Sequence, residues 1–189
     1  MSESLAEPHI SAEDFRHVFR AHPAGVAVVT ADVGDGPVAM TVSSVASLSI
    51  HPPTLVFSAS AMSSSTPTIK RAETVIVHLL SVDQIDLAKV GARSGVNRFG
   101  DDVHWSRLLT GEPYYPSADW LRRRVTQRVE VNGATLIIAE AIEASERHDS
   151  AVADPTPLVY HNRRWHALSN RSALGEPGPA FWVVYGRDD

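Results

Sequence analysis

Asn132 and Gly133 separate the two longest strand candidates of the chain, 121–131 and 135–144. An Asn-Gly pair favours a two-residue turn whose backbone twist matches that of the strands on either side. We therefore predict a long antiparallel hairpin in the second half of the chain. A chain built around such a hairpin must place other strands beside it to bury the apolar face.

Shorter β-branched and apolar runs precede and follow the hairpin and are bounded by Gly, Pro, Asp and Ser. They predict strands over 26–30, 38–42, 54–57, 74–80, 158–160 and 165–168. Asp35-Gly36 marks a turn between the first two, and the last two should complete the sheet. Three helices are expected, starting near Ser11, Ser65 and Asp83. Many short strands with few helices predict a mainly β protein, a barrel with helical covers.

Two of these helices carry specific expectations. Phe15, Val18 and Phe19 form an apolar stripe on the first, which should cover an end of the barrel. Gly91 and Gly95 should loosen the end of the third.

Composition limits the class of protein. With 189 residues the chain fits one domain, and with no cysteine it has neither disulfides nor thiolate chemistry. A net charge of -5 argues against a general nucleic-acid binder. The acidic start, without a basic and apolar signal, and the lack of an apolar run of about 20 residues indicate a soluble, cytoplasmic protein without membrane spans.

Small hydroxyl residues gather after two neighbouring strands. The first group comprises Met40, Thr41, Val42, Ser43, Ser44 and Ser47, and the second comprises Ser58, Ala59, Ser60, Ser64, Ser65 and Thr66. Backbone N–H groups and hydroxyls in such turns can bind the polar edge of a flat ring, and a helix start favours phosphate. The simpler alternative is that these serines only satisfy turns and caps.

Other catalytic patterns are absent from the sequence. There is no Gly-x-Ser-x-Gly elbow and no Gly-x-x-x-x-Gly-Lys loop, and Gly34-Asp35-Gly36 lacks a third glycine. His161 and His166 are five residues apart, which on one strand directs them to opposite faces. We therefore expect no metal site.

The order of several motifs resembles the flavin reductase-like family of split β-barrel proteins, which includes reductase components of two-component flavin monooxygenases. The similarity begins at 19–30, continues through 36–44, and returns at Pro52-Pro53, Arg98-Phe99, 111–113 and 157–160. It implies a split β-barrel that binds FMN or FAD and takes hydride from NADH or NADPH. It also implies a homodimer with active sites near the subunit interface, to which 160–166 contributes.

The resemblance also assigns residues. It places the two groups of hydroxyl-rich residues on the flavin ring and its phosphate tail, with Arg98 and Phe99 closing over the cofactor. Many members have a Gly-Asp-His that shapes the nicotinamide site, whereas Ala134 stands here in place of the histidine. Thr135, Tyr160 and His161 are candidates for a replacement contact.

The leading hypothesis is therefore an NAD(P)H-dependent flavin reductase that supplies a separate monooxygenase, with hydride passing directly between cofactors. Alternatives are a flavin carrier without efficient NAD(P)H oxidation and a reductase for a non-flavin acceptor. We expect a flexible start over 1–10, one domain over 11–168, and an extension over 169–189 that packs on the barrel or a partner subunit. The sequence leaves open FMN or FAD, NADH or NADPH, and the partner.

Overall fold

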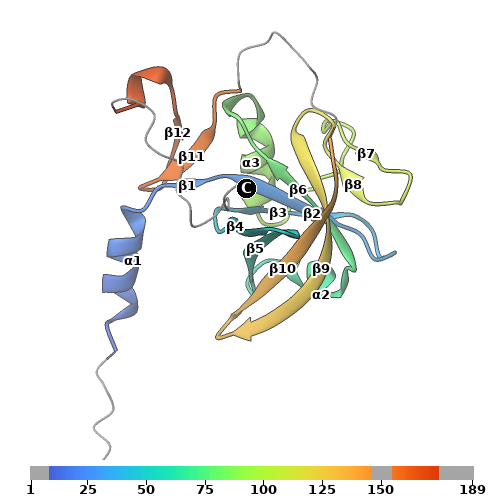
Figure 1. Ribbon diagram of the computed structural model, residues 1–189, viewed down its shortest axis with the longest axis horizontal. Coiled ribbons are helices and arrows are strands. Elements are labelled where there is room, and N and C mark those ends of the chain that lie inside the picture. The colour runs from blue at the N-terminus through green and yellow to red at the C-terminus, as the bar shows by residue number, and fades with distance from the viewer. Residues whose placement is uncertain (1–8, 146–154, 175–189) are drawn as a thin grey trace, which may run out of the picture.

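The architecture comes from a computed structural model, which describes residues 9–145 and 155–174. Seven antiparallel strands form the main sheet in the order β3-β2-β6-β9-β10-β5-β4 (Figure 1). Their bounds are β2 (Ala27–Ala31), β3 (Val38–Val42), β4 (Ala46–Ile50), β5 (Pro53–Ser60), β6 (Thr74–Leu79), β9 (Asp119–Val131) and β10 (Ala134–Ala144). The prediction of a mainly β fold with a few helices is confirmed.

Two small sheets and the helices complete the fold. The three-stranded sheet contains β1 (Ala24–Gly25), β11 (Leu158–His161) and β12 (Arg164–Ala167), and the two-stranded one contains β7 (Ser106–Arg107) and β8 (Pro113–Tyr114). The helices are α1 (Ala12–Arg20), α2 (Thr66–Arg71) and α3 (Ile85–Ala92), with 3-10 turns η1 (Val82–Gln84) and η2 (Asn170–Ser172). The strands predicted near 158–168 therefore form a sheet of their own and do not complete the main one.

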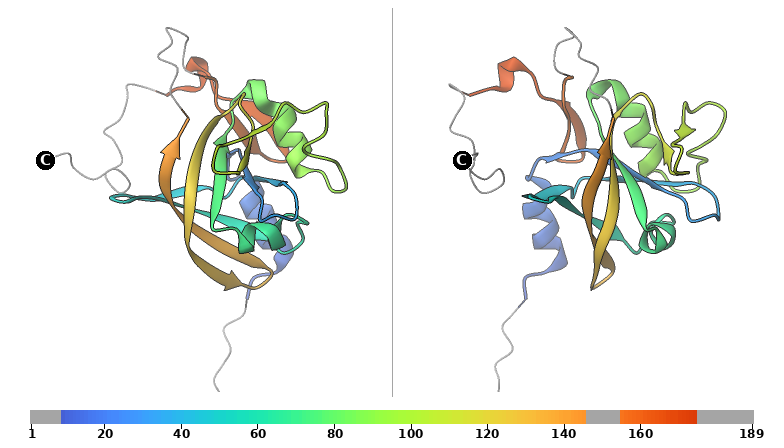
Figure 2. Two further views of the ribbon diagram at one scale, coloured as in Figure 1. Left: turned by 90° about the vertical axis from the view of Figure 1, so that its right-hand side faces the viewer. Right: turned by 45° about the vertical axis from the view of Figure 1, so that its right-hand side comes forward.

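The predicted β9–β10 hairpin is present, with Ala134 opposite Val131 and Gly133 at a φ of +84°. Two irregularities interrupt its register, after Ile138 and after Ala141. An extra residue on one strand bends it and increases its twist. The long strands accordingly curl across the molecule (Figure 2).

The curled sheet stays open along one seam. β3 and β4 are its two edges, and residues 43–45 connect them directly. β4 was not predicted, because its alternation of small Ser and Ala with apolar residues gives little β-branched signal. The turn at 43–45 therefore spans the seam of the open barrel.

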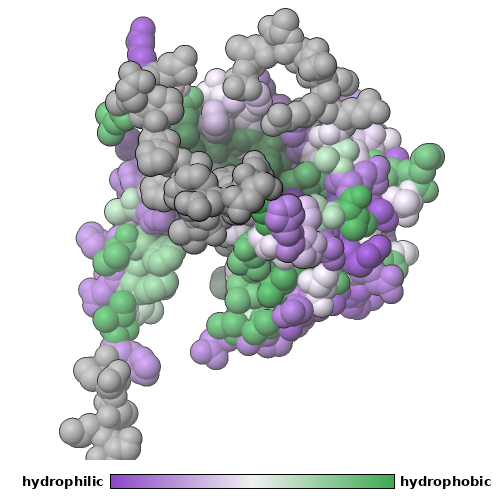
Figure 3. Space-filling model, viewed as in Figure 1, coloured by the Kyte–Doolittle hydropathy of each residue, from purple (hydrophilic) through white to green (hydrophobic). Residues whose placement is uncertain are grey.

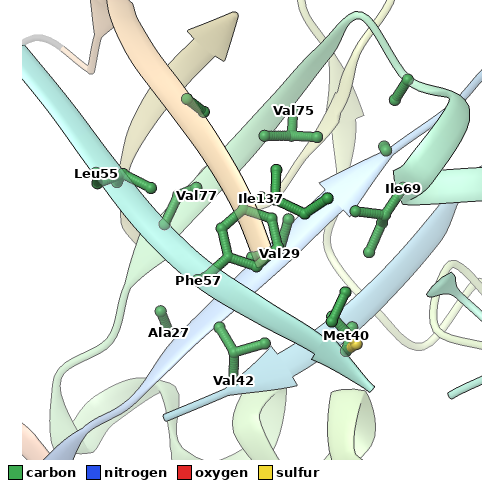
Figure 4. Close-up of a cluster of buried hydrophobic side chains, with 14 residues drawn as sticks. Ala27, Val29, Met40, Val42, Leu55, Phe57, Ile69, Val75, Val77 and Ile137 are labelled. Atoms are coloured by element: carbon green, nitrogen blue, oxygen red, sulfur yellow. The ribbon is translucent and has the colours of Figure 1, made fainter. Parts of the chain in front are cut away.

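The core has two parts, one on each face of β2, whose five residues are all buried. Inside the curl, Phe57 lies against side chains from β2, β3, β6 and β10, including Val29 and Ile137 (Figure 4). On the other face, Val28 packs with Leu158 and Tyr115 beneath α3. A strand buried on both faces explains the continuous apolar run at this position.

Helix α1 begins as predicted, with the Ser11 side chain accepting a hydrogen bond from the Asp14 N–H. The expectation that it covers an end of the barrel is wrong. None of its residues is buried, and it projects from the barrel beyond β1 (Figure 1). The chain turns away because β1 pairs with β11 and not with the main sheet. The apolar stripe therefore lies open, facing the hollow beside the barrel (Figure 3).

Gly91 in α3 has a different role from the one expected. A Cβ at this position would lie 2.3 Å from the Thr41 hydroxyl and 3.1 Å from the Thr41 backbone nitrogen. The glycine allows α3 to approach β3 closely and does not loosen the helix. Within the described ranges, no helix is long and apolar enough to cross a membrane.

Candidate functional site

The two predicted groups of hydroxyl-rich residues meet where the turn after β3 contacts β5. The Ser44 hydroxyl accepts a hydrogen bond from the Ser58 N–H at 2.9 Å, and its oxygen lies 3.4 Å from the Ser58 carbonyl. Ser43 and Ser44 are exposed, whereas Ser58 is half-buried on the outward face of β5. One side chain thus fixes the seam turn to the neighbouring strand.

Several other predicted ring or phosphate contacts use their hydroxyls inside the protein. Thr41 donates to the Ala88 carbonyl in α3, Ser65 to the Ala39 carbonyl, and Thr66 to the Ser60 carbonyl. Ser65 and Thr66 are also buried. These three hydroxyls hold α2 and α3 against the barrel. Because they already donate within the protein, they are not free to donate to a ligand.

The remaining members of the two groups divide by the alternation of the strands. Met40, Val42 and Ala59 point into the core. Ser47, Ser60 and Ser64 are exposed, and only Ser60 has a side-chain partner among the described residues, the Met62 N–H. Ser43 and Ser44 are exposed as well, so five hydroxyls of the two groups are accessible.

A cavity of about 690 Å³ opens at the seam. Ser43, Ser44, Val45 and Ala46 form one wall, α1 forms another, and the turn of the β11–β12 hairpin closes a third. Tyr160 and His161, two of the nicotinamide-side candidates, line this cavity. The fold therefore brings together residues that are more than 100 positions apart in the chain.

Arg98 and Phe99 lie elsewhere, in the long segment after α3. Phe99 stacks on Tyr115 with ring centroids 5.6 Å apart, and the Tyr115 hydroxyl donates to the Arg98 carbonyl at 2.9 Å. The guanidinium donates to the Arg93 carbonyl, while its Nε is buried without a partner among the described residues. The pair packs against the outer part of the core, and Arg98 retains a free donor.

Tyr115 is supported in turn by His78, a fully buried residue of β6. Burial lowers the pKa of His78 to about 4, although a hydrogen bond to the Val28 carbonyl opposes the shift. Burial also raises the pKa of Tyr115. Both side chains are therefore neutral near pH 7. Neither residue was predicted to have a role, since an isolated histidine within an apolar strand forms no recognisable motif.

Thr135 does not join the other nicotinamide-side candidates. It is buried opposite Ala59 and donates to the Glu130 carboxylate at 3.0 Å. Ala134, which stands in place of the family histidine, lies opposite Ser60.

The expectation that His161 and His166 point to opposite faces is wrong. Their ring centroids are 5.6 Å apart, because the two residues lie on different strands of a tight hairpin and so return to one face. Over the described ranges, no group of three or more His, Cys, Asp or Glu is placed to hold a metal ion.

A second polar recess lies beyond the other end of β2. Glu112 is almost completely buried there and accepts hydrogen bonds from Thr74, Thr110 and Arg122. Burial alone would raise the pKa of the carboxyl, but these three donors outweigh it and lower the pKa to about 2. Asp32 pairs with Arg107 nearby, at 2.6 Å. This network attaches the segment over 106–114 to the barrel and was not anticipated from sequence.

Comparison with known proteins agrees with this arrangement. Residues 19–169 match the model of the flavin reductase like domain, so the chain belongs to this family. It is 40% identical over 171 residues to an "NADH:FMN oxidoreductase" of Rhodococcus erythropolis, covering 87% of this chain and 88% of the relative.

Two further relatives extend the comparison. The reductase component of a 4-nitrophenol 4-monooxygenase/4-nitrocatechol 2-monooxygenase from Rhodococcus opacus is 28% identical over 180 residues, covering 92% of this chain and 90% of that protein. The crystal structure of a flavin reductase domain protein from Arthrobacter sp. FB24 superposes with a TM-score of 0.76 at 32% identity, covering 84% of this chain and 96% of that one.

Proposed function

We propose that this protein is an NAD(P)H-dependent flavin reductase that supplies reduced FMN or FAD to a partner monooxygenase. The observation that carries the proposal is the cavity at the open seam, lined by the exposed Ser43-Ser44 turn and by Tyr160. Ligand pockets of this kind combine aromatic surface with a few placed polar groups. The similarity to an NADH:FMN oxidoreductase supports this reaction.

The accessible groups at the seam fit a flavin. The hydroxyls of Ser43 and Ser44 and the neighbouring Ser58, Ser60 and Ser64 offer donors and acceptors to the ring edge and the ribityl chain. Ser47 is a further exposed hydroxyl of the predicted set, whereas Arg98 lies outside the cavity. When bound, the flavin accepts hydride from the nicotinamide, and the protein's contribution is to bind, orient and exclude water.

The direct test is an assay of the purified chain. The protein is mixed with NADH or NADPH and with free FMN or FAD. Catalytic loss of the absorbance of the reduced nicotinamide at about 340 nm reports hydride transfer. We expect turnover with at least one donor and one flavin. Absence of turnover with every combination, in protein shown to be folded, would refute the proposal.

Ser44→Ala locates the flavin site. The substitution removes the contacts with Ser58 and should weaken FMN binding roughly tenfold, measured by quenching of flavin fluorescence. Ser106→Ala, another exposed serine outside the seam, is the matched control and should bind FMN like the parent.

A flavin carrier without efficient NAD(P)H oxidation is the second candidate, and Ala134 is the observation that favours it. Its methyl group offers no hydrogen bond to a nicotinamide. FMN binding without loss of NADH or NADPH would identify the carrier. If Ala134→His then gave turnover, the missing imidazole would be the reason.

A homodimer is part of the proposal. Phe15, Val18 and Phe19 expose between 51% and 68% of their surface on α1. A contiguous apolar stripe of this kind marks an interaction site. A second copy seated on α1 would also border the cavity, so that the 160–166 segment would lie near the subunit interface.

The proposal of a partner monooxygenase is supported by the similarity to the relative from Rhodococcus opacus, which is the reductase component of a monooxygenase.

A further inference from the structure

The seam cavity has an unusual charge distribution. Three arginines, Arg16, Arg20 and Arg163, and two histidines, His22 and His161, line it. No Asp or Glu is among the described residues that line the cavity. The chain as a whole carries a net charge of -5, so this concentration of basic groups does not follow from composition.

The three arginines are exposed, and their charges are available to a ligand. None of the ion pairs formed within the described ranges involves Arg16, Arg20 or Arg163. The Asn162 N–H donates to the Arg20 carbonyl at 3.1 Å, which joins the end of α1 to the hairpin turn. Arg20 and Arg163 are thereby brought to the same part of the cavity wall from opposite ends of the chain.

The backbone at Arg163 provides independent support. Asn162 and Arg163 are the two central residues of the β11–β12 turn, with φ values of +48° and +61°. Turns of this type favour glycine at the second position, since a side chain there is disfavoured in the left-handed region. An arginine at that position, lining a cavity without acidic groups, indicates that the side chain serves binding and not the turn.

We propose that this cavity binds the phosphate groups of a nucleotide cofactor and that Arg163, assisted by Arg16 and Arg20, determines the affinity for them. A planar guanidinium forms paired, charge-assisted hydrogen bonds with phosphate oxygens. Tyr160 also lines the cavity and offers aromatic surface to the rings of such a cofactor. The inference rests on the proposed function, in which both the flavin and the nicotinamide donor carry phosphate.

Arg163→Gly is the decisive variant, because glycine is better suited to the turn and the substitution should leave the melting temperature unchanged or raised. We expect the KM for NADH, the dissociation constant for FMN, or both to rise roughly tenfold, with little change in kcat. A rise in the KM for NADH would show that the cavity binds the phosphates of the nicotinamide donor. A rise in the dissociation constant for FMN, measured by fluorescence titration, would show that it binds the phosphate of the flavin. Arg163→Lys should recover part of the affinity.

Arg124→Ala is the matched control, because it removes the same charge from an exposed residue of β9 outside the cavity. Unchanged constants for NADH and FMN in Arg163→Gly, or an equal loss in Arg124→Ala, would overturn the inference.

Calorimetric titration of the parent protein with ADP-ribose and with FMN needs no turnover. If the parent lacks reductase activity but binds either probe more tightly than Arg163→Gly does, the cavity assignment stands although the reductase proposal fails. If the parent and Arg163→Gly bind ADP-ribose and FMN equally, the cavity assignment is wrong whether or not the protein has reductase activity.

Discussion

The backbone N–H of Tyr115 donates a hydrogen bond to Nε2 of His78 at 3.0 Å, inside the core. Nδ1 of the same ring lies 3.0 Å from the Val28 carbonyl, so the ring must donate there. A neutral tautomer satisfies both partners, whereas a protonated ring would leave the Tyr115 N–H facing another donor. The long segment that carries Phe99 is therefore attached to β6 through an uncharged histidine.

Protonation of this histidine should weaken the fold in mild acid. Its pKa is 6.5 when unfolded and about 4 when folded, so between these values only the unfolded chain binds the proton. The free energy of unfolding should fall by up to about 3 kcal/mol as the pH is lowered through this window. Urea denaturation at pH 7 and pH 4.5 measures the effect.

His78→Gln keeps one donor and one acceptor but does not titrate. We therefore expect it to remove most of the decrease in the free energy of unfolding between pH 7 and pH 4.5. The matched control, His104→Gln, changes an exposed histidine and should leave the pH dependence as in the parent. A parent-like slope in His78→Gln would show that another group is responsible.

Glu112 should stabilise the segment over 106–114 at neutral pH. Its folded pKa of about 2 lies below the unfolded value of 4.5, so its stabilisation is complete above pH 4.5 and is lost as the pH falls through about 2. Glu112→Gln should lower the free energy of unfolding by about 2 kcal/mol at pH 7.

Glu143→Gln is the control, since Glu143 is half exposed and lies 3.9 Å from the same Arg122. We expect a change below about 0.5 kcal/mol for it in urea denaturation. Equal losses in the two variants would contradict the role given to the buried network.

Gly91→Ala should be destabilising although alanine favours helix. The new methyl group would collide with the Thr41 hydroxyl, and overpacking of this kind costs about 1–3 kcal/mol. In a Thr41→Ala background the collision with the hydroxyl is removed, and we expect the cost to fall. Chemical denaturation of the four proteins in this double-mutant cycle measures the coupling.

Gly25→Ala offers a comparison, because the space around that glycine is open. It should change stability by less than about 0.5 kcal/mol. Additive effects of Gly91→Ala and Thr41→Ala would refute the proposed contact.

Val18→Glu should weaken self-association. Val18 exposes 68% of its surface on the apolar stripe of α1, and a carboxylate there would have to be buried in the proposed dimer. We expect sedimentation velocity to show a dimer for the parent and mainly monomer for the variant. Leu109→Glu alters another exposed apolar residue, outside α1, and should remain dimeric. A parent that sediments as a monomer would contradict the proposal.

Local signals were sufficient for much of the fold. Asn132-Gly133 predicted the central hairpin, and Ser11 predicted the start of α1. By contrast, the direction of α1 depends on the pairing of β1 with β11, which no local pattern encodes. β4 was missed because small residues replace β-branched ones.

The candidate site was only partly predictable for the same reason. The hydroxyl pattern indicated the Ser43-Ser44 turn, but it could not distinguish the accessible Ser43 from Thr41, whose hydroxyl is bonded to α3. The arginines of the cavity come from α1 and from a hairpin turn about 140 positions later, so only the folded chain brings them together. His161 and His166 were misplaced because alternation along one strand does not apply across a turn.

The close contact between Gly91 and Thr41 has a consequence for ligand binding. The close approach of α3 at Gly91 and the hydrogen bond from Thr41 to the Ala88 carbonyl hold β3 against the helix, so the strand that leads into Ser43 is ordered when the protein folds. The entropy needed to order this wall is spent during folding, before any cofactor arrives. A ligand then meets a preorganised surface and retains more of its interaction energy as affinity.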